Sequence, residues 1–224
     1  QTGQVSAKDS QVFGAGIRGG SAGETRQLLV NLFDAGGNRI ITVPTAELQQ
    51  MTCEVRLVGK DAATSLSVIT SRDTCSPSPG CTDEAQGECF YTYSYKVDKP
   101  AGLYDLYVRL CPPGQTLPGL GDTITPGVSH PCDVERSPYP ITIATDRAAA
   151  LYTVPLTNPQ IATAGTPSSF TIQLHDQFGN KISTGGEATS LSAYSRLLPD
   201  GPEPGDAATV KDNSDGTYEI SFTV

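Results

Sequence analysis

The sequence of 224 residues contains no tryptophan, one methionine and two histidines, and none of its asparagines has Ser or Thr two positions later. N-linked glycans are therefore excluded on this chain. Lys and Arg number 15 against 24 Asp and Glu, which gives a net charge of −9. Binding to nucleic acid or to anionic lipid needs clustered cations, so this charge opposes both. No apolar run approaches the roughly 20 residues that cross a bilayer, so we expect no membrane-spanning segment.

Charged residues are also scarce, at 17% of the chain against the roughly 25% of an ordinary soluble domain. Glycine and proline are abundant instead, with 23 and 17 copies, and this composition favours short strands joined by many turns. The length predicts one or two domains, and we expect two small ones. The chain begins at Gln1, and Met51 is its only methionine. We interpret it as a processed or excised piece, for which a removed signal peptide would account.

All six cysteines lie in the first 132 residues: Cys53, Cys75, Cys81, Cys89, Cys111 and Cys132. An even number confined to one region is typical of a chain oxidised in a secretory compartment, so the leading interpretation is three disulfides within one domain. A zinc site is one alternative, but no C-x-x-C pair occurs and only His130 and His175 could complete it. Reduced thiols in a cytosolic protein are another. The sequence leaves the pairing open, and we favour Cys111 with Cys132 because they bracket one excursion rich in Pro and Gly.

Two copies of one sequence unit are present, 142 positions apart. The recurring positions are Ala22, Gly23, Asp34, Gly37 and Asn38 in the first copy and Ala164, Gly165, Asp176, Gly179 and Asn180 in the second. The Asp-x-x-Gly-Asn motif of each copy supplies residues that tolerate positive φ in a tight turn. The repeat predicts two tandem domains, residues 1–146 and 147–224. The linker at residues 146–150 is short and lacks glycine, so we expect restricted hinging.

Alternating apolar residues predict strands in both copies. In the second copy Phe170, Ile172 and Leu174 fall on one face of a strand, and Leu28, Val30 and Leu32 are their counterparts in the first. Three further strands are predicted in the first copy, at residues 90–97, 103–110 and 139–144. No segment of ten or more residues has a helical period with caps. The predicted fold class is all-β, with two immunoglobulin-like β-sandwiches.

Five short motifs resemble, in their order, the signatures of filamin-type immunoglobulin repeats. They are Phe13 to Gly23, the Asp-x-x-Gly-Asn turn, Pro100 to Tyr104, Ser137 to Tyr139 and Asp212 to Tyr218. The resemblance covers nearly the whole chain and implies a seven-stranded, two-sheet sandwich for each repeat. It also implies that the second repeat lacks its last strands. Exposed sheet edges are an aggregation hazard, so we expect the natural chain to continue beyond Val224.

The first repeat departs from that pattern at two insertions. Asn38 and Tyr91 are 53 positions apart, against 38 for the matching residues of the second copy, and the other insertion joins Cys111 to Cys132. Long loops pinned by cysteines are usually functional, so we expect residues 59–87, residues 112–131 or both to contact a partner. Stabilising a small core is the alternative. The candidate contact residues are Ser76, Pro77, Ser78, Pro79, Leu117, Leu120 and His130, and the Ser-Pro tip is also a candidate for O-linked sugar.

Motifs for catalysis or cofactor binding are weak. Gly14 to Gly19 matches a dinucleotide fingerprint, and Gly19 to Gly23 mimics a nucleophile elbow, but both need a strand-to-helix context that is absent. Residues 212–216 fail the calcium-loop register because the glycine stands fifth instead of sixth. The acidic residues near the cysteine loop are interpreted as solvated surface charge: Asp83, Glu84 and Glu88. The sequence therefore predicts no catalytic residue, no metal and no cofactor.

A binding or structural function remains. Secreted filamin-type repeats resemble those of the gamete-expressed adhesion proteins of plants and green algae. That family implies a cell-surface ectodomain of tandem repeats, with a membrane anchor further along the chain, that acts in gamete recognition before membrane fusion. We therefore predict a non-enzymatic extracellular adhesion fragment whose partner is another protein, either a cell-surface receptor or neighbouring repeats of one assembly. Two alternatives stay open: a subunit of an extracellular filament such as a flagellar hair, and a cytosolic scaffold of the cytoskeleton or cilium.

Overall fold

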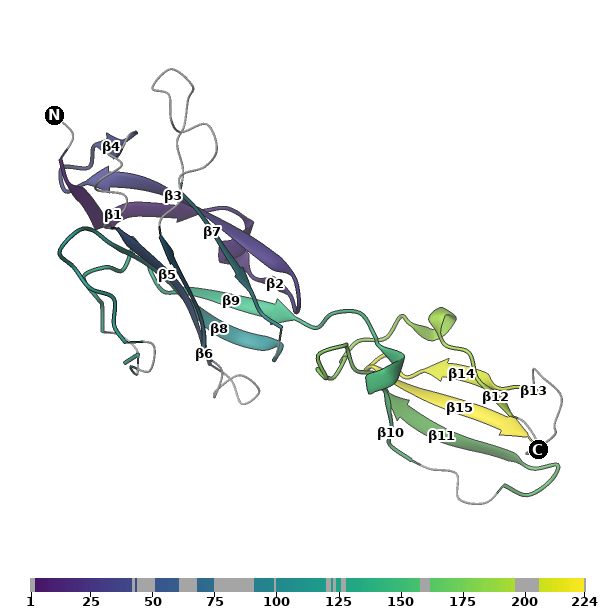
Figure 1. The fold of residues 1–224 in the computed structure, drawn as a ribbon. Helices are drawn as coiled ribbons and strands as arrows, with labels where there is room; N and C mark the ends of the chain where they lie inside the picture. Colours follow the sequence, from purple (N-terminus) through teal and green to yellow (C-terminus); the bar gives the residue numbers. More distant parts are fainter. Residues whose placement is uncertain are drawn as a thin grey trace. The chain divides into compact units, whose positions relative to one another are not determined.

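Figure 1 presents the computed structural model, which describes residues 3–41, 43, 51–60, 68–74, 91–98, 100–119, 122, 124–125, 128–157, 162–195 and 206–223. The chain divides into two compact units, Gln1–Ala144 and Thr145–Val224, called the first and the second unit below. The helices of the described part are three short 3-10 helices, η1 (Ala15–Arg18), η2 (Ala150–Tyr152) and η3 (Ala188–Ser190). The other regular elements are strands, and the predicted all-β, immunoglobulin-like class is confirmed.

The first unit contains two sheets, which lie face to face in Figure 1. One sheet is centred on β3, which pairs with β1, β4 and β7; these strands are β1 (Val5–Phe13), β3 (Thr25–Asp34), β4 (Arg39–Ile40) and β7 (Tyr91–Lys96). The other sheet has the order β2-β9-β8-β5-β6; its strands are β2 (Gly20–Ser21), β5 (Thr52–Gly59), β6 (Val68–Thr74), β8 (Gly102–Cys111) and β9 (Tyr139–Ala144). Neighbouring strands are antiparallel except β2 and β9, which are parallel.

The core of the first unit follows the predicted alternation along the strands. Every second residue of β3 is buried, and the same holds for the tyrosines of β7 and for the first half of β8. The predicted inward residues are all buried: Leu28, Val30, Leu32, Tyr91, Tyr93, Tyr95, Val97, Tyr104, Leu106 and Val108. Each fully buried aliphatic side chain stabilises the fold by about 1.5–3 kcal/mol relative to leaving it in water.

The first insertion is not a loop throughout, which corrects the prediction. Residues 68–74 form β6, which pairs with β5 over seven residue pairs from Thr52↔Thr74 to Val58↔Val68 and lies at the edge of the sheet. The physical reason is that this stretch is rich in β-branched residues, which favour extended backbone. The Ser-Pro tip of the same insertion, residues 76–79, lies outside the described residues.

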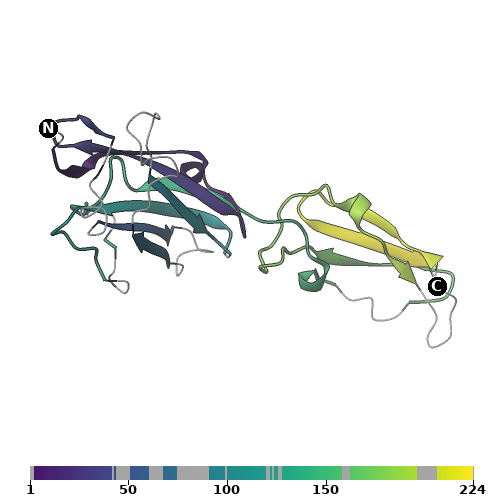
Figure 2. The same cartoon turned by 45° about the horizontal axis from the view of Figure 1, so that its top comes forward.

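The second unit is built on a sheet with the order β10-β11-β15-β14, in which β11, β15 and β14 lie side by side in both views (Figure 1 and Figure 2). Its strands are β10 (Val154–Pro155), β11 (Pro167–Gln173), β14 (Thr209–Asp212) and β15 (Thr217–Thr223), and a separate two-stranded ladder joins β12 (Tyr194–Ser195) to β13 (Asp206–Ala207). The hydrophobic cluster consists of Leu174, Ile182 and Tyr218.

One residue of the second unit breaks the predicted alternation. Leu174 is buried as expected, but it lies just beyond β11, and Phe170 and Ile172 are only half-buried. Gln173, which the alternation places outward, is 2% exposed. Its side-chain amide donates to the backbone carbonyls of Ile182 and of residues 174 and 216, at 2.8–3.1 Å. These carbonyls satisfy the NH2 group of the buried amide, and strand periodicity alone contains no signal for that.

The repeated Asp-x-x-Gly-Asn motif makes the same turn in both units. Asp34 accepts hydrogen bonds on Oδ1 from the amides of residues 36 and 38, each 2.9 Å long. Asp176 repeats this with the amides of residues 178 and 180, at 2.9 and 2.8 Å. Gly37 and Gly179 have φ of 77° and 82°, a region that glycine enters without a steric penalty. The turn residues identified from the repeat are therefore confirmed in position and in backbone conformation.

Candidate functional site: the disulfide-closed cover segment

The second insertion is closed by a disulfide. Cys111, the last residue of β8, is bonded to Cys132 with their Cα atoms 4.8 Å apart. The pairing favoured from the sequence is confirmed. The enclosed residues 112–131 are called the cover segment below. Cys53 is also disulfide-bonded, while Cys75, Cys81 and Cys89 lie outside the described residues. None of the three described cysteines is a free thiol or a zinc ligand.

The cover segment lies over the outer face of β5 and β8. Successive side chains of these strands point to opposite faces of the sheet, and the antiparallel register pairs Glu54 with Arg109 and Arg56 with Tyr107 on the face opposite the core. Such an outer face commonly meets solvent. Here Glu54 is fully buried, and the other three residues are each 3% exposed. The sheet is therefore covered on both of its faces.

Direct contacts hold the cover segment in this place. The Arg56 guanidinium donates through Nη2 to the carbonyl oxygen of Asp122, at 2.6 Å. Near the disulfide, the amide of Leu110 donates to the carbonyl oxygen of Cys132, at 2.8 Å. One contact lies in the middle of the segment and the other at its end, so the segment is fixed at points far apart in its sequence.

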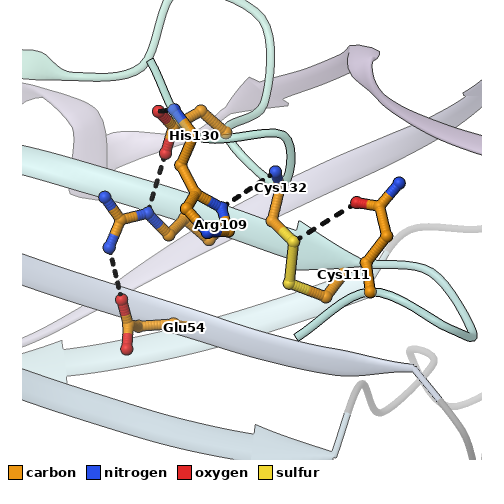
Figure 3. The surroundings of a disulfide bond; sticks show 7 residues. Glu54, Arg109, Cys111, His130 and Cys132 are labelled. Carbon is orange, nitrogen blue, oxygen red and sulfur yellow. Dashed lines mark hydrogen bonds and ion pairs between the residues drawn. A yellow bond between two sulfur atoms is a disulfide. The ribbon is translucent and has the colours of Figure 1, made fainter. Parts of the chain in front are cut away.

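A buried ion cluster lies beneath the cover segment (Figure 3). Arg109 donates through Nη1 to Glu54 Oε1 and through Nε to Asp133 Oδ1, both at 2.8 Å, and all three side chains are at most 5% exposed. The Arg109 Cζ atom also lies 5.3 Å from the centre of the Tyr107 ring, a distance at which the cation and the ring attract each other. Removing one partner of such a cluster would leave an uncompensated buried charge, at a cost of about 3–5 kcal/mol.

Asp133 connects this cluster to the end of the cover segment. Its Oδ2 atom accepts a hydrogen bond from the amide of His130, at 2.6 Å, while Oδ1 binds Arg109. His130 Nδ1 in turn accepts from the amide of Cys132, at 3.1 Å. Nδ1 is therefore unprotonated in this arrangement. Cys132, which closes the disulfide, and Asp133, which binds Arg109, are therefore both hydrogen-bonded to His130.

A small open cavity remains between the cover segment and the sheet, with a volume of about 140 Å³. Arg56 and Arg109 line it from the sheet, and Ile124, Val128 and His130 are among the residues that line it from the cover segment. The volume is below the roughly 300–1,000 Å³ of sites that enclose a small molecule. The cavity is therefore large enough for one protruding side chain of a partner and is smaller than a typical substrate pocket.

The predicted contact residues fall into two groups. Leu117 and His130 belong to the cover segment and are half-buried, and His130 lines the cavity. The remaining candidates lie outside the described residues: Ser76, Pro77, Ser78, Pro79 and Leu120. Val128, which the sequence did not single out, is the most exposed large apolar residue of the described part of the cover segment, at 63%.

Sequence reasoning also missed the ion cluster. Glu54 and Arg109 occupy alternate positions of amphipathic strands, which such a pattern assigns to solvent. The signal that could have identified part of the cluster is the position of two of its residues close to cysteines in the sequence. Arg109 stands two residues before Cys111, and Asp133 follows Cys132 directly, so the disulfide that closes the loop also brings these opposite charges together.

The glycine-rich stretch at residues 14–19 has a structural explanation. It forms η1, a single 3-10 turn, in place of the α-helix that a dinucleotide site needs. Gly19 has φ of 83°, and a Cβ atom there would lie 2.0 Å from the carbonyl oxygen of Thr142. The glycine thus permits the close approach of β2 to β9.

The other motifs considered from the sequence form turns. Residues 212–216 connect β14 to β15, and Asp212 Oδ1 accepts from the amide of Ser214, at 2.7 Å. Among the residues that the structure describes, no group of three His, Cys, Asp or Glu side chains converges as metal ligands would. Within the same residues, no helix is long and apolar enough to cross a membrane.

No known protein family matches the sequence, and no curated protein matches it either. Solved structures with some similarity include the Escherichia coli adhesin FdeC, at 16% identity and a TM-score of 0.46, and invasin, a bacterial integrin-binding protein, at 16% identity and a TM-score of 0.28. The alignments cover 98% and 96% of this chain. Domains 4–9 of the surface-layer protein SbsC have 16% identity, 96% coverage of this chain and a TM-score of 0.24.

The chain spans 56% of the FdeC structure, 33% of the invasin structure and 27% of the SbsC structure. At this identity and at TM-scores below 0.5, the similarities assign neither a family nor an activity to this chain. The fold stated above therefore depends on the strand pairing and burial of the chain itself.

Proposed function

We propose that this chain is a non-enzymatic extracellular recognition module that binds another protein through its cover segment. The observation that carries the proposal is the attachment of that segment by a disulfide, by a buried ion cluster and by the Arg56 bond to Asp122. A loop that is ordered before it meets a partner loses less conformational entropy on binding. Such anchoring supports a contact function for a long insertion.

The composition of the cover segment supports a protein partner. Asp122 is its only charged residue, in a chain that carries a net charge of −9. Charged residues are depleted at the centres of protein–protein interfaces. Val128 is exposed beside exposed Thr125 and Ser129, which gives an apolar contact point with a polar rim.

The disulfides support an extracellular location. Cys53, Cys111 and Cys132 are oxidised, and such bonds persist mainly in oxidising compartments. Thiol labelling of the denatured, unreduced protein tests this point: we expect no reactive thiol. About six would contradict the location and favour the cytosolic scaffold.

Within this function we propose that the repeats are of the filamin type and that the module acts in gamete recognition before fusion. Support comes from the five sequence motifs that resemble such repeats and from the Asp-x-x-Gly-Asn turn shared by the two units. The measurement is the binding of the labelled protein to gametes compared with vegetative cells of the same organism. Equal binding to both cell types would contradict this narrower role and leave general adhesion in place.

The cell-binding test compares two matched substitutions of exposed valines. Val128→Asp places a charge on the cover segment, and Val154→Asp places one on β10 of the second unit, where Val154 is 42% exposed. We expect Val128→Asp to weaken cell binding at least about tenfold, as a loss of roughly 1.4 kcal/mol gives, and Val154→Asp to leave it unchanged. Equal binding by both variants would overturn the role of the cover segment.

A second candidate function is packing into an extracellular filament. The observation in its favour is a run of exposed apolar side chains at the start of the second unit, Leu151, Tyr152, Val154 and Leu156, which are 42–87% exposed. Exposed apolar groups of this kind often mark interaction sites. Electron microscopy and sedimentation distinguish the two functions. Ordered assembly without cell binding, abolished by Val154→Asp and retained by Val128→Asp, would replace adhesion with filament formation.

A further inference from the structure

A larger cavity lies elsewhere in the first unit, with a volume of about 460 Å³. It opens where the end of β1, η1 and the turn before β9 come together. Its lining combines apolar, aromatic and polar side chains. The apolar and aromatic residues are Val12, Ile17, Pro138, Tyr139 and Pro140, and the polar ones are Gln11, Glu135 and Arg136. Its volume falls within the roughly 300–1,000 Å³ typical of small-molecule sites, and none of the contact residues predicted from the sequence lines it.

One wall of the cavity is set by an irregularity in the pairing of β1 with β3. The pairing of β1 with β3 shifts register between Ser6 and Gln11. Ser10 is fully buried within the shift; its hydroxyl donates to the carbonyl oxygen of Ser6, at 2.7 Å, and accepts from the amide of Phe33, at 3.2 Å. A register shift, like a β-bulge, redirects the side chains that follow it. Here the residues that follow are Gln11 and Val12, both of which line the cavity.

The opposite wall is held rigidly by backbone hydrogen bonds. The amide of Glu135 donates to the carbonyl oxygen of Ser10, at 3.0 Å, which ties the two walls together. Ser137 accepts on its hydroxyl from the amide of Val108, at 3.1 Å. Between them Arg136 has φ of 64°, and among the described residues Ser214 is the one other non-glycine residue with positive φ. Strained backbone of this kind clusters at ligand-binding sites, where the surrounding structure enforces it.

Several polar groups that line the cavity already have partners. The Tyr139 hydroxyl already donates to the carbonyl oxygen of Glu135, which leaves the ring as a contact surface. Burial and the nearby Glu135 raise the pKa of Tyr139 to about 12, so the ring is neutral at physiological pH. Arg136 Nε lies 3.4 Å from Glu135 Oε1, so these charges offset each other. Gln11 adds an amide that both donates and accepts.

From this geometry we propose that the cavity binds a neutral saccharide. A pyranose ring presents an apolar C–H face, which fits the ring of Tyr139 and the neighbouring prolines. Its hydroxyl groups both donate and accept hydrogen bonds, which fits the amide, the carboxylate and the guanidinium that line the cavity. The paired charges of Glu135 and Arg136 leave no net charge to favour an ion. The site goes beyond the proposed protein contact and does not depend on it.

The test is a titration of the full chain followed by ¹H–¹⁵N NMR. The probes are the methyl glycosides of glucose, galactose, mannose and N-acetylglucosamine at millimolar concentrations, with sodium acetate as a charged comparison. We expect at least one glycoside to shift the amides of Gln11, Arg136 and Tyr139, while acetate does not. Arg136→Gly removes the guanidinium at a position where glycine relieves the strain, and Gln11→Ala removes the amide. Each should weaken binding at least tenfold.

The matched control is Lys8→Ala, an exposed residue of β1 that does not line the cavity; it should bind as the unmodified chain does. Four outcomes would overturn the site: no shift with any glycoside, shifts confined to amides away from the cavity, undiminished binding by both cavity variants, or equal shifts with acetate. Cell binding by Arg136→Gly separates this proposal from the previous one. Retained cell binding with lost glycoside binding would support the saccharide site alone.

Discussion

The two units share a turn but differ in how much they bury. The first unit has buried side chains from two sheets and a second buried layer beneath the cover segment. The second unit has a hydrophobic cluster of three residues with partly buried neighbours, and a run of exposed apolar residues at η2 and β10. A repeat in sequence therefore preserves local hydrogen bonding and does not preserve the size of the core.

The difference indicates what the second insertion contributes to the first unit. The polar face of β5 and β8 would meet solvent in a plain two-sheet sandwich. The cover segment turns that face into a buried layer, in which Arg109 pairs with Glu54 and Asp133 and Arg56 donates to a backbone carbonyl. Stability in the first unit should thus depend strongly on the buried ion cluster; among the described residues of the second unit, the ion pair between Lys211 and Glu219 is exposed.

The largest expected effect comes from breaking the ion cluster. Arg109→Ala removes the cation that binds both Glu54 and Asp133 in a buried site, so we expect the first unit to lose about 3–5 kcal/mol of unfolding free energy. Amide hydrogen exchange followed separately in each unit is the measurement. The second unit should keep its protection. A loss in the first unit below about 1 kcal/mol, the range of exposed pairs, would contradict a buried cluster.

Removal of the cover-segment disulfide should follow in size. Cys111→Ser combined with Cys132→Ser opens a loop of 21 residues' separation, and we expect about 3 kcal/mol of destabilisation confined to the first unit. Proteolysis should then cut the cover segment first. A doubly substituted chain with an uncut cover segment and unchanged exchange would show that the ion cluster alone holds the segment.

Acid should affect both units through the turn that they share. The pKa of Asp34 lies below its usual 3.8 because the backbone and side chain of Asn38 donate to its carboxylate. Burial raises the pKa of Asp176, but hydrogen bonds from Asn180, Asp146 and Phe178 outweigh it, and the net direction is also downward. Since the folded pKa values are depressed, this stabilisation is complete above about 3.8 and is lost as the pH falls through the lower folded values.

The acid prediction is checked one unit at a time. Asp34→Asn should flatten the pH dependence of stability below about 3.8 in the first unit, and Asp176→Asn should do so in the second. Circular dichroism during urea unfolding at a series of pH values provides the measurement. An unchanged acid slope in the substituted unit would assign the acid lability to other carboxylates.

The smallest effect is expected at an exposed ion pair. Lys211 and Glu219 are 3.5 Å apart on neighbouring strands of the second unit, with 73% and 36% of their side chains exposed. Solvent screens such a pair, so Lys211→Ala should change stability by about 0–1 kcal/mol. Comparison of this loss with that of Arg109→Ala measures how much more a buried ion pair contributes to the free energy of unfolding than an exposed one. Similar losses in both variants would remove the distinction between the units.

Much of the fold was predictable because local periodicity reflects burial. Leu28, Val30 and Leu32 alternate in sequence and are buried together, and residues 139–144 form β9 as predicted. The exceptions have long-range causes. Strand β6 owes its place to pairing with β5, and Gln173 is buried because carbonyl groups from three different positions meet its amide.

The candidate sites were predictable only in part. Cys111 and Cys132 identified the closed segment, since cysteines that bracket a loop are informative without a structure. Glu54, one of the two partners of Arg109, was not identifiable, because it is 55 residues away in the chain and only the β5–β8 register brings the two side chains together. No pattern in the sequence predicted the cavity beside η1, because the register shift in β1 and the turn before β9 form it jointly.

The amino-acid sequence by itself determined the all-β class, the two-fold repeat and the Asp-x-x-Gly-Asn turns, and it favoured the segment that the disulfide closes. These depend on alternation, on residues that tolerate positive φ and on covalent chemistry, all of which act over short distances along the chain. Only the tertiary structure decided which charges are buried, where the cover segment rests and which side chains form a cavity. Such outcomes require contacts between strands that are distant in sequence, and their register is set by the packing of the whole unit.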